Sequence, residues 1–213
     1  MRVVLYGSRP DGHARVVLEL LLDAESINVV GLIDDRPENA DRRIAELSVV
    51  GTRSDLPALS REGVEGVVLG FGAVDGRDVV VEAIDSAGLV LPILVHESAH
   101  VSASAALSDG TQVLPHASIG PGARIGRGVL INTGAIVEHD VTVADYTVIG
   151  PGAVLAGRAI IGEAVEIGAR AVVLPDIHVP ARAVVGAGAV VTRAVREGQT
   201  VVGVPARPLS TGL

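Results

Sequence analysis

The sequence predicts a small parallel α/β domain followed by a parallel β-helix. The β-helix is predicted because residues 99–194 divide, without insertion, into sixteen blocks of six residues, and the third residue of every block is Val, Ile or Leu. The α/β domain is predicted because the repeat is absent before about residue 95, where short apolar runs alternate with amphipathic, helix-like ones. We therefore expect two domains, residues 1–95 and residues 96–213.

The composition argues against several classes of function. Two Tyr, one Phe and no Trp leave Val, Ile, Leu and Ala to build the core, which suits stacked β-branched layers. The absence of Cys excludes a disulfide framework and a thiolate nucleophile. A net charge of −8 with scattered Arg residues argues against nucleic-acid binding. No apolar stretch reaches membrane-spanning length, so we expect a cytoplasmic protein that does not insert into membranes.

The amino-terminal residues predict a small Rossmann-like sheet with alternating strands and helices. The expected elements, in chain order, are a strand at 2–6, a helix at 14–24, a strand at 27–35, a strand at 63–72, a helix at 77–87 and a strand at 91–96. Ligands of such sheets bind beyond the carboxyl ends of the strands. The loop from Gly7 to His13, together with Asp34, Asp35 and Gly72, falls there.

The loop before the first helix is a candidate phosphate site. It lacks the three-glycine spacing of the dinucleotide fingerprint, so NAD is not inferred. Gly12 and His13 at the start of a helix can still offer free N–H groups to a phosphate. Asp34 and Asp35 can accept hydrogen bonds from hydroxyl, imide or amine groups of a ligand. The alternative for both carboxylates is a solvated turn after a strand.

The six-residue repeat predicts a triangular coil. An aliphatic residue in every six, flanked by Gly, Pro, Asp and Asn, describes a short strand followed by a tight corner. Three blocks close one coil, and the third residue of each block points inward. Each strand then pairs in parallel with the strand three blocks further on.

Together the two halves resemble the sugar O-/N-acetyltransferases of the NeuD/PglD type, within the hexapeptide-repeat acyltransferases. The resemblance covers nearly the whole chain and is carried by YGSRPDGHARVV, GLIDD, GFGAVDGR, INTGAIVEHD and GVPARPL. It implies a left-handed coil, which the physics of the repeat does not supply, since crossovers are usually right-handed. It also implies a homotrimer with acetyl-CoA in the groove between neighbouring helices, and a nucleotide sugar bound by the first domain.

The segment INTGAIVEHD carries the predicted catalytic residues. In the enzymes that the chain resembles, the histidine matching His139 is the general base, and the acidic residue matching Asp140 raises its basicity. An imidazole can accept a proton near neutral pH, and a carboxylate partner fixes its tautomer. The alternative for His139 is an ordinary surface histidine at a corner.

The resemblance also assigns contacts to both ligands. Gly157 is expected to place its N–H near the thioester carbonyl, with Ala169 and Ala187 along the pantetheine groove and Arg207 near the nucleotide end of the coenzyme. The alternative for the small residues is simple β-helix packing. His13 matches the loop histidine of the family near the phosphates or the acceptor sugar, and Asp11 and Gly12 in the same loop are expected to contact the substrate as well. This loop is two residues longer than the common form of the family.

The expected function is therefore transfer of an acetyl group from acetyl-CoA to the amino group of a nucleotide-linked amino sugar, a 4-amino-4,6-dideoxy sugar in the resembled pathways. Direct attack is expected, because no Cys is present and no Ser stands in a nucleophile motif. The alternatives are O-acetylation of a sugar such as a sialic acid, and non-catalytic binding of a sugar nucleotide. No metal site is expected, because His116, His139 and His178 do not share the spacing that convergent zinc ligands need.

Overall fold

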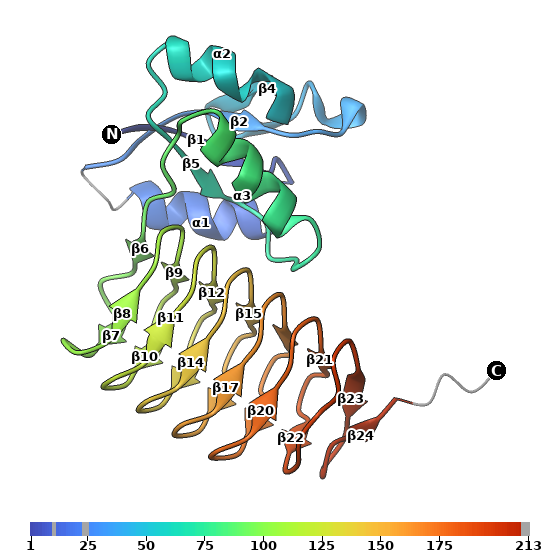
Figure 1. Cartoon of the computed structure of the whole chain (residues 1–213). Helices are drawn as coiled ribbons and strands as arrows, with labels where there is room; N and C mark the ends of the chain where they lie inside the picture. The colour runs from blue at the N-terminus through green and yellow to red at the C-terminus, as the bar shows by residue number, and fades with distance from the viewer. Residues whose placement is uncertain (10–11, 23–25, 210–213) are drawn as a thin grey trace. The chain divides into compact units, whose positions relative to one another are not determined.

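The computed structural model describes residues 1–9, 12–22 and 26–209, and the chain forms two compact units (Figure 1). The first unit is Met1–Pro92 and the second is Ile93–Leu213, so the division lies three residues before the predicted boundary at residue 95. No helix in the described ranges is long and apolar enough to span a membrane.

The first unit contains a five-stranded sheet with the strand order β3-β4-β2-β1-β5. Its strands are β1 (Arg2–Tyr6), β2 (Asn28–Ile33), β3 (Arg43–Ile44), β4 (Leu47–Gly51) and β5 (Gly66–Leu69). The predicted strands β1, β2 and β5 pair in parallel, as expected. The strand β4 pairs in parallel with β2 and forms an antiparallel hairpin with β3. The carboxyl ends of β1, β2 and β5 therefore meet at one edge.

The helices of this unit are α1 (His13–Leu22), α2 (Leu56–Arg61) and α3 (Arg77–Ser86), with 3₁₀ turns η1 (Pro37–Asn39) and η2 (Arg53–Asp55). The sequence predicts α1 and α3 because both have a long amphipathic pattern. It does not predict α2 or the β3–β4 hairpin. A six-residue helix and a two-residue strand are too short to show a period against their polar surroundings.

The strand predicted at 91–96 belongs to the second unit, which corrects its assignment to the first. The strand β6 (Leu94–Val95) pairs in parallel with residues Gln112–Val113 of the β-helix. The block Ile93–Ser98 continues the six-residue register, with Val95 in the third position. Among the described residues of the first unit, only an isolated bridge between Gly66 and Val90 extends its sheet.

The second unit is a parallel β-helix whose two-residue strands stack into three sheets. One sheet contains β7 (His100–Val101), β10 (Ser118–Ile119), β13 (Ile136–Val137), β16 (Val154–Leu155), β19 (Val172–Val173) and β22 (Val190–Val191). A second contains β8 (Ala106–Leu107), β11 (Arg124–Ile125), β14 (Thr142–Val143), β17 (Ile160–Ile161) and β20 (His178–Val179). The third contains β6, β9 (Gln112–Val113), β12 (Leu130–Ile131), β15 (Val148–Ile149), β18 (Glu166–Ile167), β21 (Val184–Val185), β23 (Thr200–Val202) and the antiparallel β24 (Arg207–Pro208).

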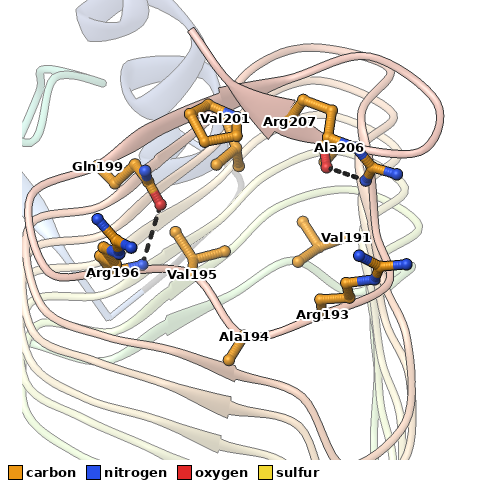
Figure 2. A pocket seen from close by; sticks show the side chains of 10 residues that line it. Val191, Arg193, Ala194, Val195, Arg196, Gln199, Val201, Ala206 and Arg207 are labelled. Atoms are coloured by element: carbon orange, nitrogen blue, oxygen red, sulfur yellow. Dashed lines mark hydrogen bonds between the residues drawn. The ribbon is translucent and has the colours of Figure 1, made fainter.

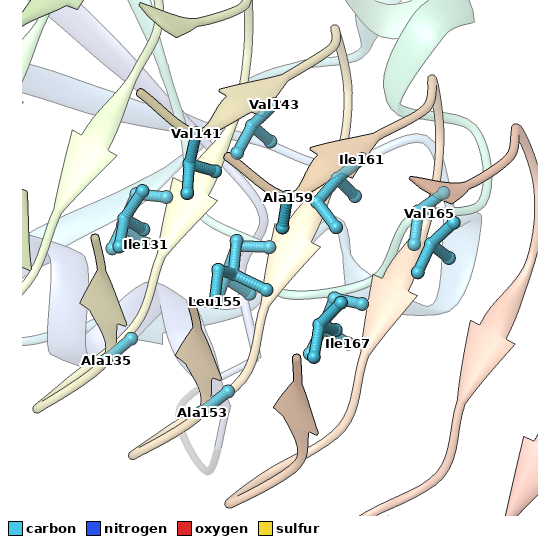
Figure 3. Close-up of a cluster of buried hydrophobic side chains, with 14 of the residues drawn as sticks. Ile131, Ala135, Val141, Val143, Ala153, Leu155, Ala159, Ile161, Val165 and Ile167 are labelled. Atoms are coloured by element: carbon cyan, nitrogen blue, oxygen red, sulfur yellow. The ribbon is translucent and has the colours of Figure 1, made fainter. Parts of the chain in front are cut away.

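The predicted register is confirmed, because strands from β6 to β22 pair with partners three blocks away, as in Ser118 with Ile136. The third residues of the blocks from Val113 to Val191 are buried and form one continuous core. Figure 3 shows part of this core. Leu155 and Ile161 point into the coil, together with small first residues of the blocks such as Ala153. Burial of each large aliphatic side chain contributes about 1.5–3 kcal/mol.

The corners of the coil explain why Gly recurs at the sixth position of a block. The sixth residue has a positive φ in block after block, from Gly110 to Gly188. Glycine adopts this conformation without a steric penalty. Residues with a side chain also occupy this position, as at Asp140 (φ 58°) and Ala164 (φ 51°), at a local steric cost.

Candidate functional site

His139 lies on a corner between two glycines of the neighbouring coils. A Cβ atom on Gly120 would lie 2.8 Å from the backbone nitrogen of His139. A Cβ atom on Gly157 would contact Nε2 of His139 and would lie 2.7 Å from Cε1 of the same ring. The Nε2 edge of the imidazole therefore lies over the α-carbon of Gly157. The side chain of His139 is 45% exposed. The ring is both positioned and accessible.

Asp140 fixes the other edge of the ring. Its Oδ2 lies 3.0 Å from Nδ1 of His139. A carboxylate can only accept, so in the neutral ring this contact favours the proton on Nδ1 and the lone pair on Nε2. The ring thus has the tautomer that a general base needs, with its lone pair toward Gly157.

Gly157 supplies a backbone donor at the same place. Within the described ranges its N–H makes no hydrogen bond inside the chain, whereas the N–H of Arg158 donates to the carbonyl of His139 over 3.0 Å. A free N–H next to a base is the arrangement that stabilises an oxyanion during acyl transfer. Base and donor come from consecutive coils, so the rigid stacking of the β-helix sets their spacing.

Ala169 and Ala187 lie on a different corner from Gly157. They stack on each other, since the N–H of Gly188 donates to the carbonyl of Ala169 over 2.8 Å, and both are exposed. Within one chain, neither alanine stands on the corner that carries His139 and Gly157.

Arg207 lies at the rim of a cavity of about 300 Å³ at the end of the β-helix (Figure 2). Val191, Val195 and Val201 line its apolar part. Figure 2 shows Arg207 and Arg193 on one side of the cavity. The guanidinium of Arg207 donates to the carbonyl of Ala206 over 2.8 Å.

Arg193 and Arg196, which also line this cavity, are absent from the predicted site. In the described part of the chain, no carboxylate forms an ion pair with Arg193, Arg196 or Arg207. The register could have revealed Arg193, because it stands two coils beyond Gly157 on the same corner. Guanidinium groups that have no carboxylate partner and lie beside an apolar cavity suit an anion attached to an apolar group.

The amino-terminal unit has a cavity of about 200 Å³ at the carboxyl ends of β1 and β5. Three predicted residues, Gly12, His13 and Gly72, line it. Two cationic residues that the prediction lacks, Arg9 and Arg36, line it as well. Asp11 lies outside the described residues. The prediction that the N–H of Gly12 is free is wrong, because this N–H donates to the carbonyl of Arg9 over 3.2 Å. Cationic side chains next to the first turn of α1 make this cavity suitable for a phosphate group.

Asp34 lies behind this cavity rather than in its lining. Its Oδ2 accepts hydrogen bonds from Oγ of Ser8 (2.6 Å) and from the guanidinium of Arg36 (3.3 Å), both of which line the cavity. Burial would raise the pKa of Asp34, but the hydrogen bonds from Arg36 and Ser8 outweigh it and lower the pKa to about 2. Asp34 thus remains ionised and holds two side chains that face a ligand.

Asp35 is also engaged by the protein. Its carboxylate accepts hydrogen bonds from the hydroxyl of Tyr6 (2.5 Å) and from the backbone N–H of Arg53 (2.7 Å). Burial, with the adjacent Asp35 carboxylate, raises the pKa of Tyr6. The side chain of Asp35 is 39% exposed, so it keeps a face toward solvent.

The histidines considered as metal ligands occupy different places in the coil. His116 and His139 lie on two different corners, and His178 lies on the strand β20. Across the residues that the structure describes, no three His, Asp or Glu side chains gather in an arrangement that would hold a metal ion. That the protein needs no metal remains a prediction.

Two family models match the sequence. Residues 2–84 match the PglD N-terminal domain, and residues 122–157 match the bacterial transferase hexapeptide (six repeats). No curated protein gives a significant match to the chain.

Solved structures are similar to the chain over almost its whole length. A histidine-to-asparagine mutant of perosamine N-acetyltransferase from Caulobacter crescentus, in complex with CoA and GDP-perosamine, is 32% identical with a TM-score of 0.92. The match covers 99% of this chain and 97% of that one. The acetyltransferase domain of PglB from Neisseria gonorrhoeae, in complex with acetyl coenzyme A, is 33% identical with a TM-score of 0.89, and the match covers 98% of each chain.

A third structure, WeeI from Acinetobacter baumannii, is 23% identical with a TM-score of 0.84, and the match covers 98% of this chain and 100% of that one. At this identity it bears on the fold alone. Together the comparisons confirm the predicted fold class, an α/β domain followed by a left-handed β-helix.

Proposed function

The chain belongs to the NeuD/PglD-type hexapeptide-repeat acetyltransferases, and on that premise we propose that it transfers an acetyl group from acetyl-CoA to the amino group of a nucleotide-linked amino sugar. One observation carries the proposal. The Nε2 edge of the His139 ring lies over Gly157, and Nδ1 faces Asp140 at 3.0 Å. The enzymes with CoA and GDP-perosamine bound support the choice of an amino-sugar acceptor.

His139 acts as the general base in this proposal. Its Nε2 takes a proton from the acceptor amine as the nitrogen forms a bond to the thioester carbonyl carbon. Asp140 stabilises the imidazolium that results. The N–H of Gly157 donates to the oxyanion of the tetrahedral intermediate. His139 then returns the proton to the departing sulfur as the carbon–sulfur bond breaks, so the base is regenerated.

The arginine cavity at the end of the β-helix would hold the phosphates of the coenzyme. Arg193 follows His139 and Gly157 along the same corner, two coils beyond Gly157, which is about 10 Å at roughly 4.8 Å per coil. A coenzyme with its thioester at Gly157 would therefore run along this edge toward Arg193 and Arg207. The cavity lined by Arg9, Arg36 and His13 would hold the diphosphate of the nucleotide sugar.

A homotrimer is part of the proposal. The outer face of the sheet from β7 to β22 presents an aliphatic stripe of Ile136, Val154, Val172 and Val190, of which Ile136 is 38% exposed. A stripe of this kind beside His139 favours contact with another copy of the chain. Such a contact would let Gly157 of one copy and Ala169 of another face the same coenzyme. We also propose the cytoplasm as the site of action.

The test is a thiol-release assay with acetyl-CoA and a panel of acceptors. We expect turnover with UDP-, dTDP- or GDP-linked 4-amino-4,6-dideoxy sugars, and none with the matching 4-hydroxy sugars or with free sialic acid. Mass spectrometry of the product locates the acetyl group. Turnover with a hydroxyl acceptor alone would replace the proposal with O-acetylation. Binding of the sugar nucleotides without any thiol release would indicate a binding protein.

A further inference from the structure

The corner that carries His139 also carries an alternating series of charges. Asp140, Arg158 and Asp176 are spaced three blocks apart and so occupy the same place in three consecutive coils. All three have a positive φ, at 58°, 61° and 61°. A residue with a side chain adopts this conformation at a steric cost that glycine avoids. Other corners carry side chains in the same conformation, as at Ala164 and Arg182, so this corner is distinguished by the alternating signs of its charges and not by its backbone.

Arg158 stands one coil from each of the two carboxylates but binds only one of them. Its Nε and a terminal nitrogen donate to Oδ1 and Oδ2 of Asp176 over 2.7 and 2.8 Å. This contact lowers the pKa of Asp176 and raises the pKa of Arg158, and the charge of Asp140 adds a smaller contribution to the second effect. Both carboxylates thus attract the same guanidinium, and the pair of hydrogen bonds to Asp176 makes Asp176 its preferred partner.

Asp140 turns the other way. Its Oδ2 contacts Nδ1 of His139, and its Oδ1 lies 2.5 Å from the place that a Cβ atom on Gly122 would take. The absence of a side chain at Gly122 leaves room for this carboxylate on the side away from Arg158. Asp140 therefore pairs with the imidazole of His139, whereas Arg158 pairs with Asp176.

The Arg158–Asp176 pair has little value for stability. Both side chains are more than half exposed, at 53% and 63%. Exposed ion pairs contribute little, because water solvates the separated charges well and holding two side chains in place costs entropy. A role in stability alone does not account for two charged residues at strained positions beside a base.

We propose that Asp176 is a positioning residue for acetyl transfer, which anchors Arg158 on the far side so that the carboxylate of Asp140 stays on Nδ1 of His139. The inference rests on the proposed role of His139. Without Asp176, Arg158 is free to turn toward Asp140, which is the other carboxylate one coil away. A guanidinium on Asp140 competes with Nδ1 for the same oxygens, and the imidazole loses the partner that fixes its tautomer.

The test is a set of four variants assayed with the amino-sugar nucleotide that the wild type acetylates. Asp176→Asn removes the anchoring charge, and Asp176→Glu keeps it. Arg158→Gln removes the competitor, and the fourth variant combines Arg158→Gln with Asp176→Asn. We expect Asp176→Asn to lower kcat about tenfold, the scale of one hydrogen bond to a charged group, with KM little changed. The other three variants should stay within about twofold of the wild type.

A second readout needs no substrate. Nitrogen-15 NMR of His139 at neutral pH reports which ring nitrogen carries the proton. We expect the Nδ1–H tautomer in the wild type, a larger share of the Nε2–H tautomer in Asp176→Asn, and recovery of the Nδ1–H tautomer in the double variant. If the wild type acetylates no acceptor, the proposed function fails and this readout still decides the role of Asp176.

The proposal is overturned if Asp176→Asn matches the wild type in kcat and in tautomer. It is also overturned if the double variant is as impaired as Asp176→Asn, because a purely structural ion pair would give no rescue. Thermal unfolding of each variant separates a loss of folding from a loss of positioning.

Discussion

The imidazole of His139 lies directly over the α-carbon of Gly157, one coil further along the same corner of the β-helix. Nothing larger than hydrogen fits on Gly157 while the ring holds this position. The pair therefore links a base to a backbone donor through the three-block register of the fold.

Replacement of Gly157 by Ala tests this relationship without any substrate. The new methyl group would overlap Nε2 of His139, so the ring must move. We expect Gly157→Ala to lower the free energy of unfolding by about 1–3 kcal/mol in the wild-type background, as overpacking usually does. In a His139→Ala background the same change should cost much less, because the ring is gone. Equal costs in the two backgrounds, measured by denaturant unfolding, would show that the methyl group does not meet the ring.

The arginines at the end of the β-helix should govern affinity for acetyl-CoA. We expect Arg193→Gln and Arg207→Gln each to raise KM for acetyl-CoA about tenfold, the scale of one lost charge-assisted hydrogen bond. Arg182→Gln is the matched control, because Arg182 lies on another corner. Steady-state kinetics with acetyl-CoA and its dephospho form show which phosphate is bound. An unchanged KM in both variants would remove this cavity from the coenzyme site.

Asp34 should make the first unit sensitive to acid. Its pKa is about 2 in the folded chain against 3.8 as the ordinary value, so the folded state favours the charged form by about 2 kcal/mol. This contribution of Asp34 to the free energy of unfolding is fully present above pH 4 and is lost as the pH falls through 2. Asp34→Asn should therefore destabilise residues 1–92 at pH 7, and the difference from the wild type should shrink between pH 4 and pH 2.

Hydrogen exchange in residues 1–92 measures this effect separately from the β-helix. The exposed Asp41 gives the control variant, Asp41→Asn, which should leave exchange near that of the wild type. If Asp34→Asn and the wild type respond alike across this pH range, the hydrogen bonds from Ser8 and Arg36 do not stabilise the carboxylate.

Much of the β-helix could be predicted because a short sequence repeat specifies each of its strands. The inward residue recurs every six positions, and one register places every strand. The same register extends to Val95, so the strand β6 could have been assigned to the β-helix had the blocks been continued backwards. The handedness could not be predicted in this way, since the same repeat is compatible with a left-handed or a right-handed coil.

The first unit was harder to predict in detail because its ligand-facing side chains are set by contacts across the sheet. Sequence alone offers Asp34 and Asp35 as direct ligands of a substrate. In the structure, Asp34 holds Ser8 and Arg36 toward the cavity, and Asp35 holds Tyr6. Ser8 and Tyr6 lie far from these carboxylates along the chain, so no local pattern joins them. Arg36 is close to Asp34 in sequence, and a search for cations beside the carboxylates could have found it.

The most direct measurement for the account as a whole is kcat of His139→Asn with acetyl-CoA and an amino-sugar nucleotide that the wild type acetylates. General base catalysis contributes about 10²–10⁴-fold, so we expect kcat to fall by at least about 100-fold with little change in KM. His178→Asn, a change at an exposed histidine on the strand β20, should keep the wild-type rate. A His139→Asn variant that folds normally and retains a kcat close to the wild type would contradict the assignment of His139 as the base.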